Sequence, residues 1–174
     1  MPTIMCARRL WTLLGDRGAL PPRNVVAEGT NKLQAWSAQD VETAAGHLVV
    51  ALEEVTYLTL VFPFEPFPVF LHNFSAALSM ALRDLGVPTA IAEAEAEAVV
   101  LQSRFAKNDN RSLQGSVTDV TSHAGWRLEG ARRWDFEAIR KAQRHLNHMP
   151  HCRHEPSLPS DGVRLLFSKE TPPH

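Results

Sequence analysis

The apolar positions of residues 68–86 repeat with the period of an α-helix. Between Pro68 and Gly86 they fall at i, i+3, i+4 and i+7, the pattern of an amphipathic helix that covers a core. These positions are Phe70, Leu71, Phe74, Ala77, Leu78, Ala81, Leu82 and Leu85. Gly86 is suited to end this helix, and Pro88 fits the first turn of a second one that runs through Ile91–Val99.

The chain before this helix is rich in residues that favour strands. His47–Glu54 and Val55–Pro63 contain many Val, Leu, Thr, Tyr and Phe residues, and we expect them to be two antiparallel strands with Glu53–Glu54 at the turn or edge between them. Leu33–Val41 is predicted as a third strand, preceded by a loop over Asp16–Asn31. Shorter strands are expected at Thr3–Ala7 and Leu101–Ala106.

Three more stretches have helical character. Arg8–Leu14 ends at Gly15, Arg111–Trp126 follows the N-cap candidates Asn108–Asp109–Asn110, and Trp134–Asn147 is ended by Pro150. Beyond Glu155, only Val163–Phe167 has the apolar character needed to pack. Strands that come first and helices that come later predict an α+β fold, a small antiparallel sheet with helices packed on one face.

The length and composition suit one soluble domain. The 174 residues are 44% hydrophobic and 21% charged, and we place a single domain at residues 3–167 with a flexible tail at 168–174. The longest apolar run, Tyr57–Pro63, is far shorter than the roughly 20 residues of a membrane span, so no membrane association is expected. Cys6 and Cys152 form no disulfide framework, which favours a reduced, cytoplasmic protein.

Charge is unevenly distributed along the chain. The net charge is −1 overall, but residues 28–100 carry a net −8 and residues 101–154 a net +5. A positive face for an anionic partner is one interpretation. The other is that the acidic and basic segments pair with each other across the fold.

The segment from Lys107 to Asp119 carries the most specific pattern in the chain. It is a polar loop that leads into a helix, where free backbone N–H groups and the helix dipole favour an anion. We expect its side chains to form an anion-binding site, with the members Lys107, Asn108, Asn110, Arg111, Ser112, Ser116 and Asp119. Gly115 costs a helix about 1 kcal/mol relative to Ala, a cost that is tolerated where a neighbour or a ligand approaches closely. In the competing interpretation Asn110 or Ser112 merely caps the helix and Arg111 pairs with an acid.

This segment resembles the signature Lys-Thr-x-Asn-Arg-Ser-x-x-Gly-Ser-x-Asn-Asp of a family of uncharacterised bacterial proteins, the domain of unknown function 6933. Cys6-Ala-Arg-Arg-Leu resembles the opening Cys-Thr-Lys-Lys-Leu of that family, and Leu146-Asn147-His148-Met149-Pro150 resembles its late Leu-Asn-Arg-Thr-Pro. Trp36 stands where the family has a tryptophan that opens a strand. The resemblance implies a shared fold and a shared central site over about residues 3–167, but no activity.

Other candidate chemistry is weaker. His145, His148, His151, Cys152 and His154 include the ligand types of zinc, but their spacing matches no common zinc motif. We therefore predict a solvated, histidine-rich loop and no resident metal; structural zinc and adventitious nickel or zinc binding are the alternatives.

Two further groups of ionisable residues are assigned to the surface. Asp119 and His123 lie one helical turn apart and could act as an acid–base pair, although a surface hydrogen bond is the simpler interpretation. The acids Glu53, Glu54, Glu93, Glu95 and Glu97 are predicted to be solvated, and Cys6 to be a buried residue at the end of the first strand.

Three functions remain open at this point. The first is a non-enzymatic module that binds an anionic ligand, a nucleic acid or an acidic protein around residues 107–116. The second is an enzyme for a phosphate-bearing small substrate or RNA, with the same segment as electrostatic support. The third is a purely structural or interaction domain. No cofactor motif is present, and the catalytic residues, the ligand and the oligomeric state are not determined by the sequence.

Overall fold

The computed structural model describes residues 2–15, 31–66, 68–151 and 155–168. Its elements are β1 (Thr3–Cys6), α1 (Arg8–Gly15), β2 (Ala35–Thr43), β3 (Gly46–Glu53), β4 (Thr59–Pro63), α2 (Val69–Asp84), α3 (Thr89–Gln102), β5 (Arg104–Lys107), α4 (Arg111–Arg127), α5 (Phe136–Leu146) and α6 (Pro159–Phe167). Apart from Asn31 and Ser168, the predicted loop at 16–31 and the predicted tail at 168–174 lie outside the described residues.

The five strands form one sheet in the order β4-β3-β2-β1-β5. β2, β3 and β4 are antiparallel, whereas β1 pairs in parallel with β2 on one side and with β5 on the other. The predicted α+β class and single domain are confirmed, but the prediction of a wholly antiparallel sheet was wrong. A period of two residues marks a strand without stating its direction, and here β2, the strand that follows α1, runs parallel to β1.

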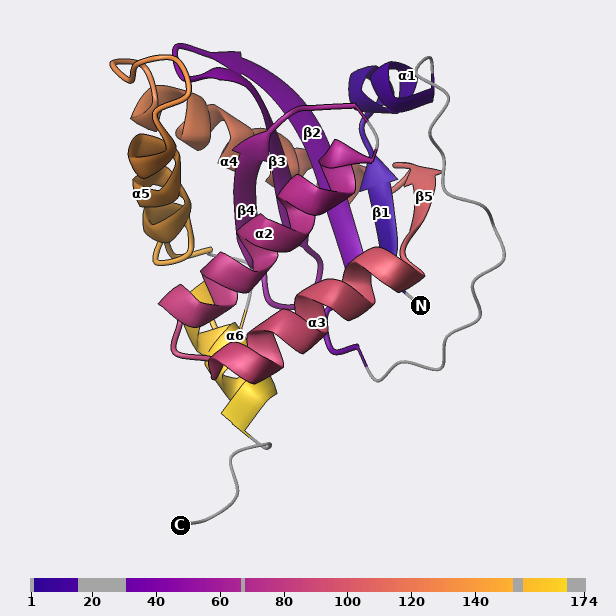
Figure 1. Cartoon of the computed structure of the whole chain (residues 1–174), viewed down its shortest axis with the longest axis vertical. Helices are drawn as coiled ribbons and strands as arrows, with labels where there is room; N and C mark the ends of the chain where they lie inside the picture. The colour runs from indigo at the N-terminus through magenta and orange to yellow at the C-terminus, as the bar shows by residue number, and fades with distance from the viewer. Residues whose placement is uncertain (1, 16–30, 67, 152–154, 169–174) are drawn as a thin grey trace.

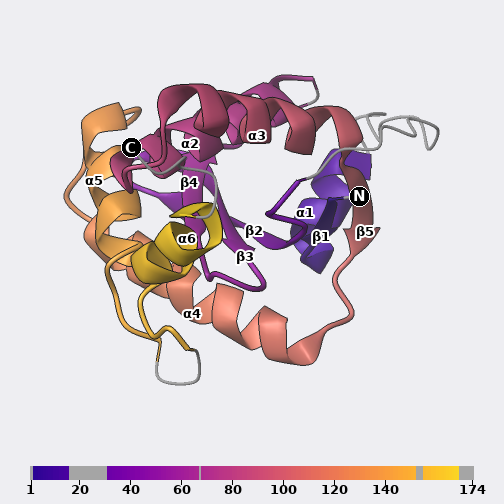
Figure 2. The same ribbon diagram turned by 90° about the horizontal axis from the view of Figure 1, so that it is seen from below.

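Helices cover both faces of the sheet, so the prediction that they occupy one face was wrong (Figure 2). The reason is β3, in which every residue from Leu48 to Leu52 is fully buried. Val49 and Ala51 belong to the core beneath α1, α2, α3 and α6, while Leu48, Val50 and Leu52 belong to the core beneath α4 and α5. Within the described residues, none of the helices combines the length and apolar character that crossing a bilayer requires.

The helix predicted between Pro68 and Gly86 is α2, and its apolar face fills the larger core. The Phe74 ring packs edge-on against Trp36 of β2 at 5.1 Å and against Phe62 of β4 at 5.7 Å. Gly86 has φ +91°, the left-handed conformation that glycine adopts most easily. The next residue then donates its N–H to the Leu82 carbonyl at 3.0 Å and closes the helix.

Two of the acids predicted to be solvated, Glu53 and Glu95, are buried. Glu53 Oε2 accepts from the N–H of Val55 at 3.0 Å and from the N–H and Oγ1 of Thr56 at 2.7 and 2.8 Å. Burial raises the pKa of Glu53 above its ordinary value, although these hydrogen bonds oppose the shift. Glu95 Oε1 accepts from the backbone N–H groups of Lys32 and Leu33, both at 2.9 Å. Both carboxylates are buried because they satisfy backbone donors that would otherwise have none.

The turn after β3, which Glu53 stabilises, also makes β4 shorter than predicted. Tyr57 has a φ of 58°, and β4 begins at Thr59, four residues later than predicted. Val55, predicted to lie in the strand, is 63% exposed in the turn.

Strand β4 lies at one edge of the sheet, and side chains of α5 replace the missing neighbour. Thr59 donates its N–H to Asn147 Oδ1 at 2.7 Å and accepts from Asn147 Nδ2 at 2.9 Å. Val61 donates its N–H to Gln143 Oε1 at 2.8 Å. The free backbone groups of an edge strand invite pairing with another chain, and these amides occupy them.

We expect Asn147→Ala to lower the free energy of unfolding by roughly 1–3 kcal/mol for each Thr59 backbone group left buried without a partner. Chemical denaturation of the variant and of the wild type measures the difference. Lys141→Ala on the exposed face of α5 is the matched control and should change stability by less than about 0.5 kcal/mol. Equal stability of both variants would contradict the role assigned to Asn147.

Candidate functional site

The signature segment lies at the carboxyl ends of two neighbouring parallel strands. β1 and β5 are paired in parallel with Cys6 opposite Lys107, so the two strands finish at the same end of the sheet (Figure 1). α1 follows β1 onto one face and α4 follows β5 onto the opposite face. In open sheets with parallel strands, ligands bind where successive connections diverge in this way. The fold therefore places the 107–116 segment at the position that such sheets use for binding.

Asn108 connects this edge of the sheet to α4. It is 3% exposed, and its N–H extends the β1–β5 pairing by donating to the Cys6 carbonyl at 2.9 Å. Its side chain donates to Ser37 Oγ of β2 at 2.5 Å and accepts from the Asn110 N–H at 3.0 Å. Gln114 of α4 donates to the Asn108 carbonyl. These bonds occupy Asn108 within the protein, so its role is to hold the loop rather than to face a ligand.

Asn110 is the N-cap of α4. Its Oδ1 accepts from the Leu113 N–H at 3.2 Å, which satisfies one of the free donors of the first turn. Within the described part of the chain, the N–H groups of Arg111 and Ser112 have no acceptor. Both residues are exposed, so these two donors face solvent at the positive end of the dipole of a 17-residue helix.

Three exposed cations lie on the segments that leave this end of β1 and β5. Arg8 begins α1, Lys107 ends β5 and Arg111 begins α4, and among the described residues none of the three forms an ion pair. The exposed carboxylate of Asp109 lies in the same loop. The competing interpretation, in which Arg111 pairs with an acid of the −8 segment, finds no support among these residues.

The remaining predicted members lie further along α4. Ser116 donates its Oγ to the Ser112 carbonyl at 3.3 Å, a bond within the helix. Asp119 is two turns beyond Arg111, with its carboxylate 70% exposed and 4.0 Å from His123 Nε2. The structure thus leaves Lys107, Arg111 and Ser112 exposed near the start of α4, uses Asn108 and Asn110 to build that start, and places Asp119 two turns away from it.

A cluster of charges around the buried Asp40, which the sequence did not predict, joins α1 to the β2–β3 hairpin. Asp40 is 1% exposed in its side chain, and its Oδ2 lies 3.0 Å from both Arg9 Nε and His47 Nε2. His47 Nδ1 is 3.6 Å from Glu42 Oε1. Both ring nitrogens therefore face carboxylates, which leaves neither free for a substrate. The signal in the sequence was the pairing of Glu42 with His47 across the hairpin.

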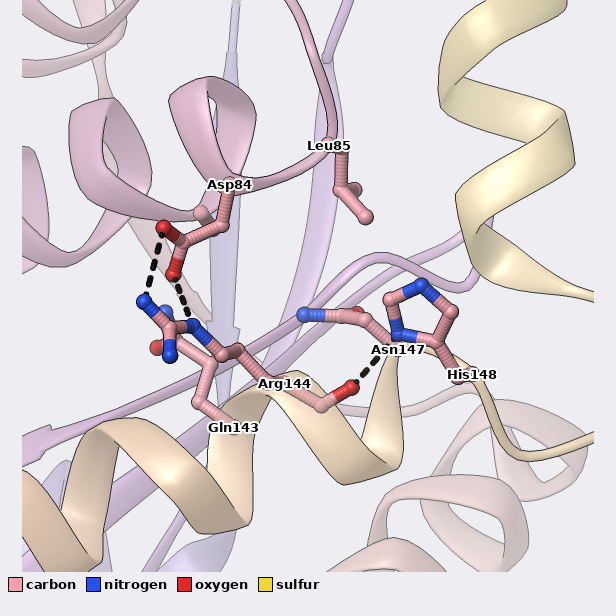
Figure 3. Close-up of a pocket in the computed structure, with 7 residues that line it drawn as sticks. Asp84, Leu85, Gln143, Arg144, Asn147 and His148 are labelled. Carbon is pink, nitrogen blue, oxygen red and sulfur yellow. Dashed lines mark hydrogen bonds and ion pairs between the residues drawn. The ribbon is translucent and has the colours of Figure 1, made fainter.

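A second charged cluster joins α2 to α5. Asp84 accepts from Arg140 at 2.7 Å and from Arg144 at 2.8 Å, beside a pocket that Gln143, Asn147 and His148 also line (Figure 3). The pocket has a volume of about 10 Å³, room for about one water molecule and too small for a ligand.

A larger depression lies between the β3–β4 turn and α6. Its volume is about 300 Å³ and its lining is mostly apolar: Val55, Thr56, Glu155, Pro156, Gly162, Leu165 and Leu166. It contains no cation, so it does not suit an anion.

The histidine-rich run forms no metal site among the described residues. His145 Nε2 accepts from Arg127 Nη2 at 2.5 Å, and the His151 ring packs on Tyr57 at 4.9 Å. Cys152 and His154 lie outside the described residues. Cys6, as predicted, is fully buried at the end of β1, and burial raises the pKa of its thiol to about 12.

Residues 3–161 match the family described as a domain of unknown function (DUF6933). The chain belongs to this family. The match covers the whole sheet, the start of α4 and the Asn147 region. No curated protein and no solved structure matches the chain.

We expect the Asp84 cluster to stabilise the fold above about pH 4 and to lose that effect toward pH 2. Burial raises the pKa of Asp84, but the hydrogen bonds and charges of Arg140 and Arg144 outweigh it and lower the pKa from 3.8 to about 2. A lowered pKa means that the unfolded chain binds the proton first, so stability falls as the pH falls through this range. Thermal melts should show the deficit of Asp84→Asn shrinking between pH 4 and pH 2. Asp161→Asn, from an exposed pair, is the control; a deficit in Asp84→Asn that does not change with pH would contradict the assignment.

Proposed function

We propose that this protein is a non-enzymatic binding module that holds an anionic ligand, such as a phosphate group, at the N-terminus of α4. The observation that carries the proposal is Arg111. It is exposed and has no acid partner within the described residues, and it stands beside two free backbone donors at the carboxyl ends of β1 and β5. Lys107 and Arg8 add positive charge at the same edge. Such a set of donors and cations binds the oxygens of an anion through charge-assisted hydrogen bonds.

The wider distribution of charge supports this proposal. In the basic segment 101–154, Arg140 and Arg144 form ion pairs with an acid of residues 28–100, and that acid is Asp84 in both cases. Two of the acids in the −8 segment, Glu53 and Glu95, are buried against backbone donors. The cations at the start of α4 therefore remain available to a partner.

Gly115 supplies a further argument for a ligand. It is exposed on α4 one turn after Arg111, and a Cβ added there would meet nothing within 4 Å. No described element therefore requires a glycine at this position, although glycine weakens a helix by about 1 kcal/mol relative to alanine. Close approach of a ligand to the helix backbone accounts for this cost.

A binding module fits these observations better than an enzyme. Asp119 and His123 are 4.0 Å apart on an exposed helix surface, and neither lines the pocket beside Asp84 or the depression beside α6. Cys6, at the same sheet edge, is buried with a raised pKa and is not available as a nucleophile. We also propose a cytoplasmic setting, which the free thiol of Cys6 supports.

Arg111→Ala tests the site. We expect its affinity for inorganic phosphate or a short oligonucleotide, measured by calorimetry, to fall by roughly 1.5–3 kcal/mol, the range of a hydrogen bond to a charged group. Its thermal stability without ligand should be nearly unchanged, because Arg111 is exposed. Gly115→Ala should raise the melting temperature and weaken binding.

The matched control is Arg83→Ala, which removes an exposed arginine at the end of α2. It should leave binding unchanged. If Arg111→Ala and Arg83→Ala bind the anion as tightly as the wild type, the proposed site is wrong. A large loss of stability in Arg111→Ala without ligand would instead assign this residue to the fold.

A further inference from the structure

We propose that the anionic ligand is a single-stranded nucleic acid, which binds along α4 with a phosphate at the Arg111 end and a base stacked on Trp126 at the other end. This inference rests on the proposed function, because it takes the phosphate site at the start of α4 as one of its two anchors.

Trp126 is the first observation. It lies in the last turn of α4 and is 69% exposed. The other tryptophans are covered to a greater extent, with Trp36 fully buried and Trp11 and Trp134 half-buried. An indole ring exposed to this extent contributes little to the fold, and it offers a flat surface on which any base can stack.

The surroundings of Trp126 are the second observation. The His123 ring packs edge-on against the indole at 5.0 Å and 82°. Arg127 follows it in the chain and contacts His145 Nε2 of α5 at 2.5 Å. The pKa of His145 is lowered by burial and by the charges of Arg127, His123 and His148, which places His145 of α5 in the same group of ionisable side chains. An exposed aromatic ring among cationic and ionisable side chains suits a base with its phosphates better than an apolar protein surface.

Two exposed acids also belong to α4 or follow it directly: Asp119, 4.0 Å from His123 Nε2, and Glu129, just beyond the helix.

The geometry of α4 connects the two anchors. Arg111 and Trp126 are separated by 15 positions, which corresponds to about 22 Å along the axis and about 60° around it. Both therefore lie on the outward side of the helix, opposite the buried face of Leu113, Val117, Val120 and Ala124. In Figure 2 α4 runs along the lower border of the molecule with no element outside it. Ser112, Gly115 and Ser122 lie between the anchors on this outward side and leave a low surface along which a strand can lie, beside the exposed carboxylate of Asp119.

The experiment distinguishes the contribution of the phosphate anchor at Arg111 from that of the stacking anchor at Trp126. It uses two oligonucleotides of equal length. Fluorescence anisotropy is measured with a labelled thymidine strand of about 12 nucleotides and with an abasic strand that has the same phosphates but no bases. We expect Trp126→Ala to weaken binding of the thymidine strand about 5- to 150-fold, the range for loss of one stacked base. Binding of the abasic strand should not change. Trp126→Phe should retain much of the affinity, and Arg111→Ala should weaken both strands.

Several results would overturn the inference and leave the proposed function in place. These are unchanged binding of the thymidine strand by Trp126→Ala, an equal loss on both strands, or binding of inorganic phosphate without binding of either strand. Binding of a polyglutamate peptide with the same loss in Trp126→Ala would assign the surface to an acidic protein instead. If the wild type binds neither phosphate nor either strand at low salt, the proposed function fails as well. A uridine oligonucleotide of the same length, measured in the same way, shows whether the protein binds RNA or DNA more tightly.

Discussion

Because every residue from Leu48 to Leu52 is buried, strand β3 has to be covered on both of its faces. This requirement places α2 and α3 on one face of the sheet and α4 and α5 on the other. It also determines what happens at the neighbouring parallel strands, where α1 and α4 leave the same edge in opposite directions after β1 and β5. The position of the candidate site therefore follows from how the apolar centre of the sheet is covered. Because α1 lies on one face and α4 on the other, the segments that follow β1 and β5 diverge at this point.

The polar residues of the family signature divide into two groups with different physical roles. Asn108 and Asn110 are occupied by bonds to Ser37, Cys6 and the first turn of α4, and Asn147 is occupied by both backbone groups of Thr59. An amide suits these places because it donates and accepts at once and carries no charge that burial would penalise. The charged members, Lys107 and Arg111, are exposed instead. The signature thus combines residues that build the start of α4 with exposed residues that we propose act on a partner.

The buried acids affect the electrostatics as much as the exposed bases do. Glu53 and Glu95 lie inside the protein, where they accept hydrogen bonds from backbone N–H groups, and Asp40 is enclosed by Arg9 and His47. A carboxylate in such a place is tolerated only when donors or cations surround it. Part of the negative charge of residues 28–100 is therefore used inside the fold. Of the bases in residues 101–154, Asp84 pairs with Arg140 and Arg144. The two ends of α4, with Arg111 at one and Arg127 at the other, are the regions on which the proposals depend.

The sequence by itself determined the elements whose pattern is local. The spacing of Phe70, Phe74 and Leu78 defined α2, Gly86 ended it, and Asn110 was among the candidates that precede α4, because helix period and capping depend on residues at most four positions apart. The family followed from short signatures in the same way. Only the tertiary structure decided the direction of β1 and β5, the burial of Glu53, and the difference between a covered Trp36 and an exposed Trp126. Each of these depends on which distant segments pack together: Glu53 is enclosed by its own turn and the core above it, and Trp126 is exposed because none of the described elements packs on the outward side of α4. Local periodicity contains no information about such partners, since the same alternation or helical stripe is compatible with several arrangements of the remaining chain.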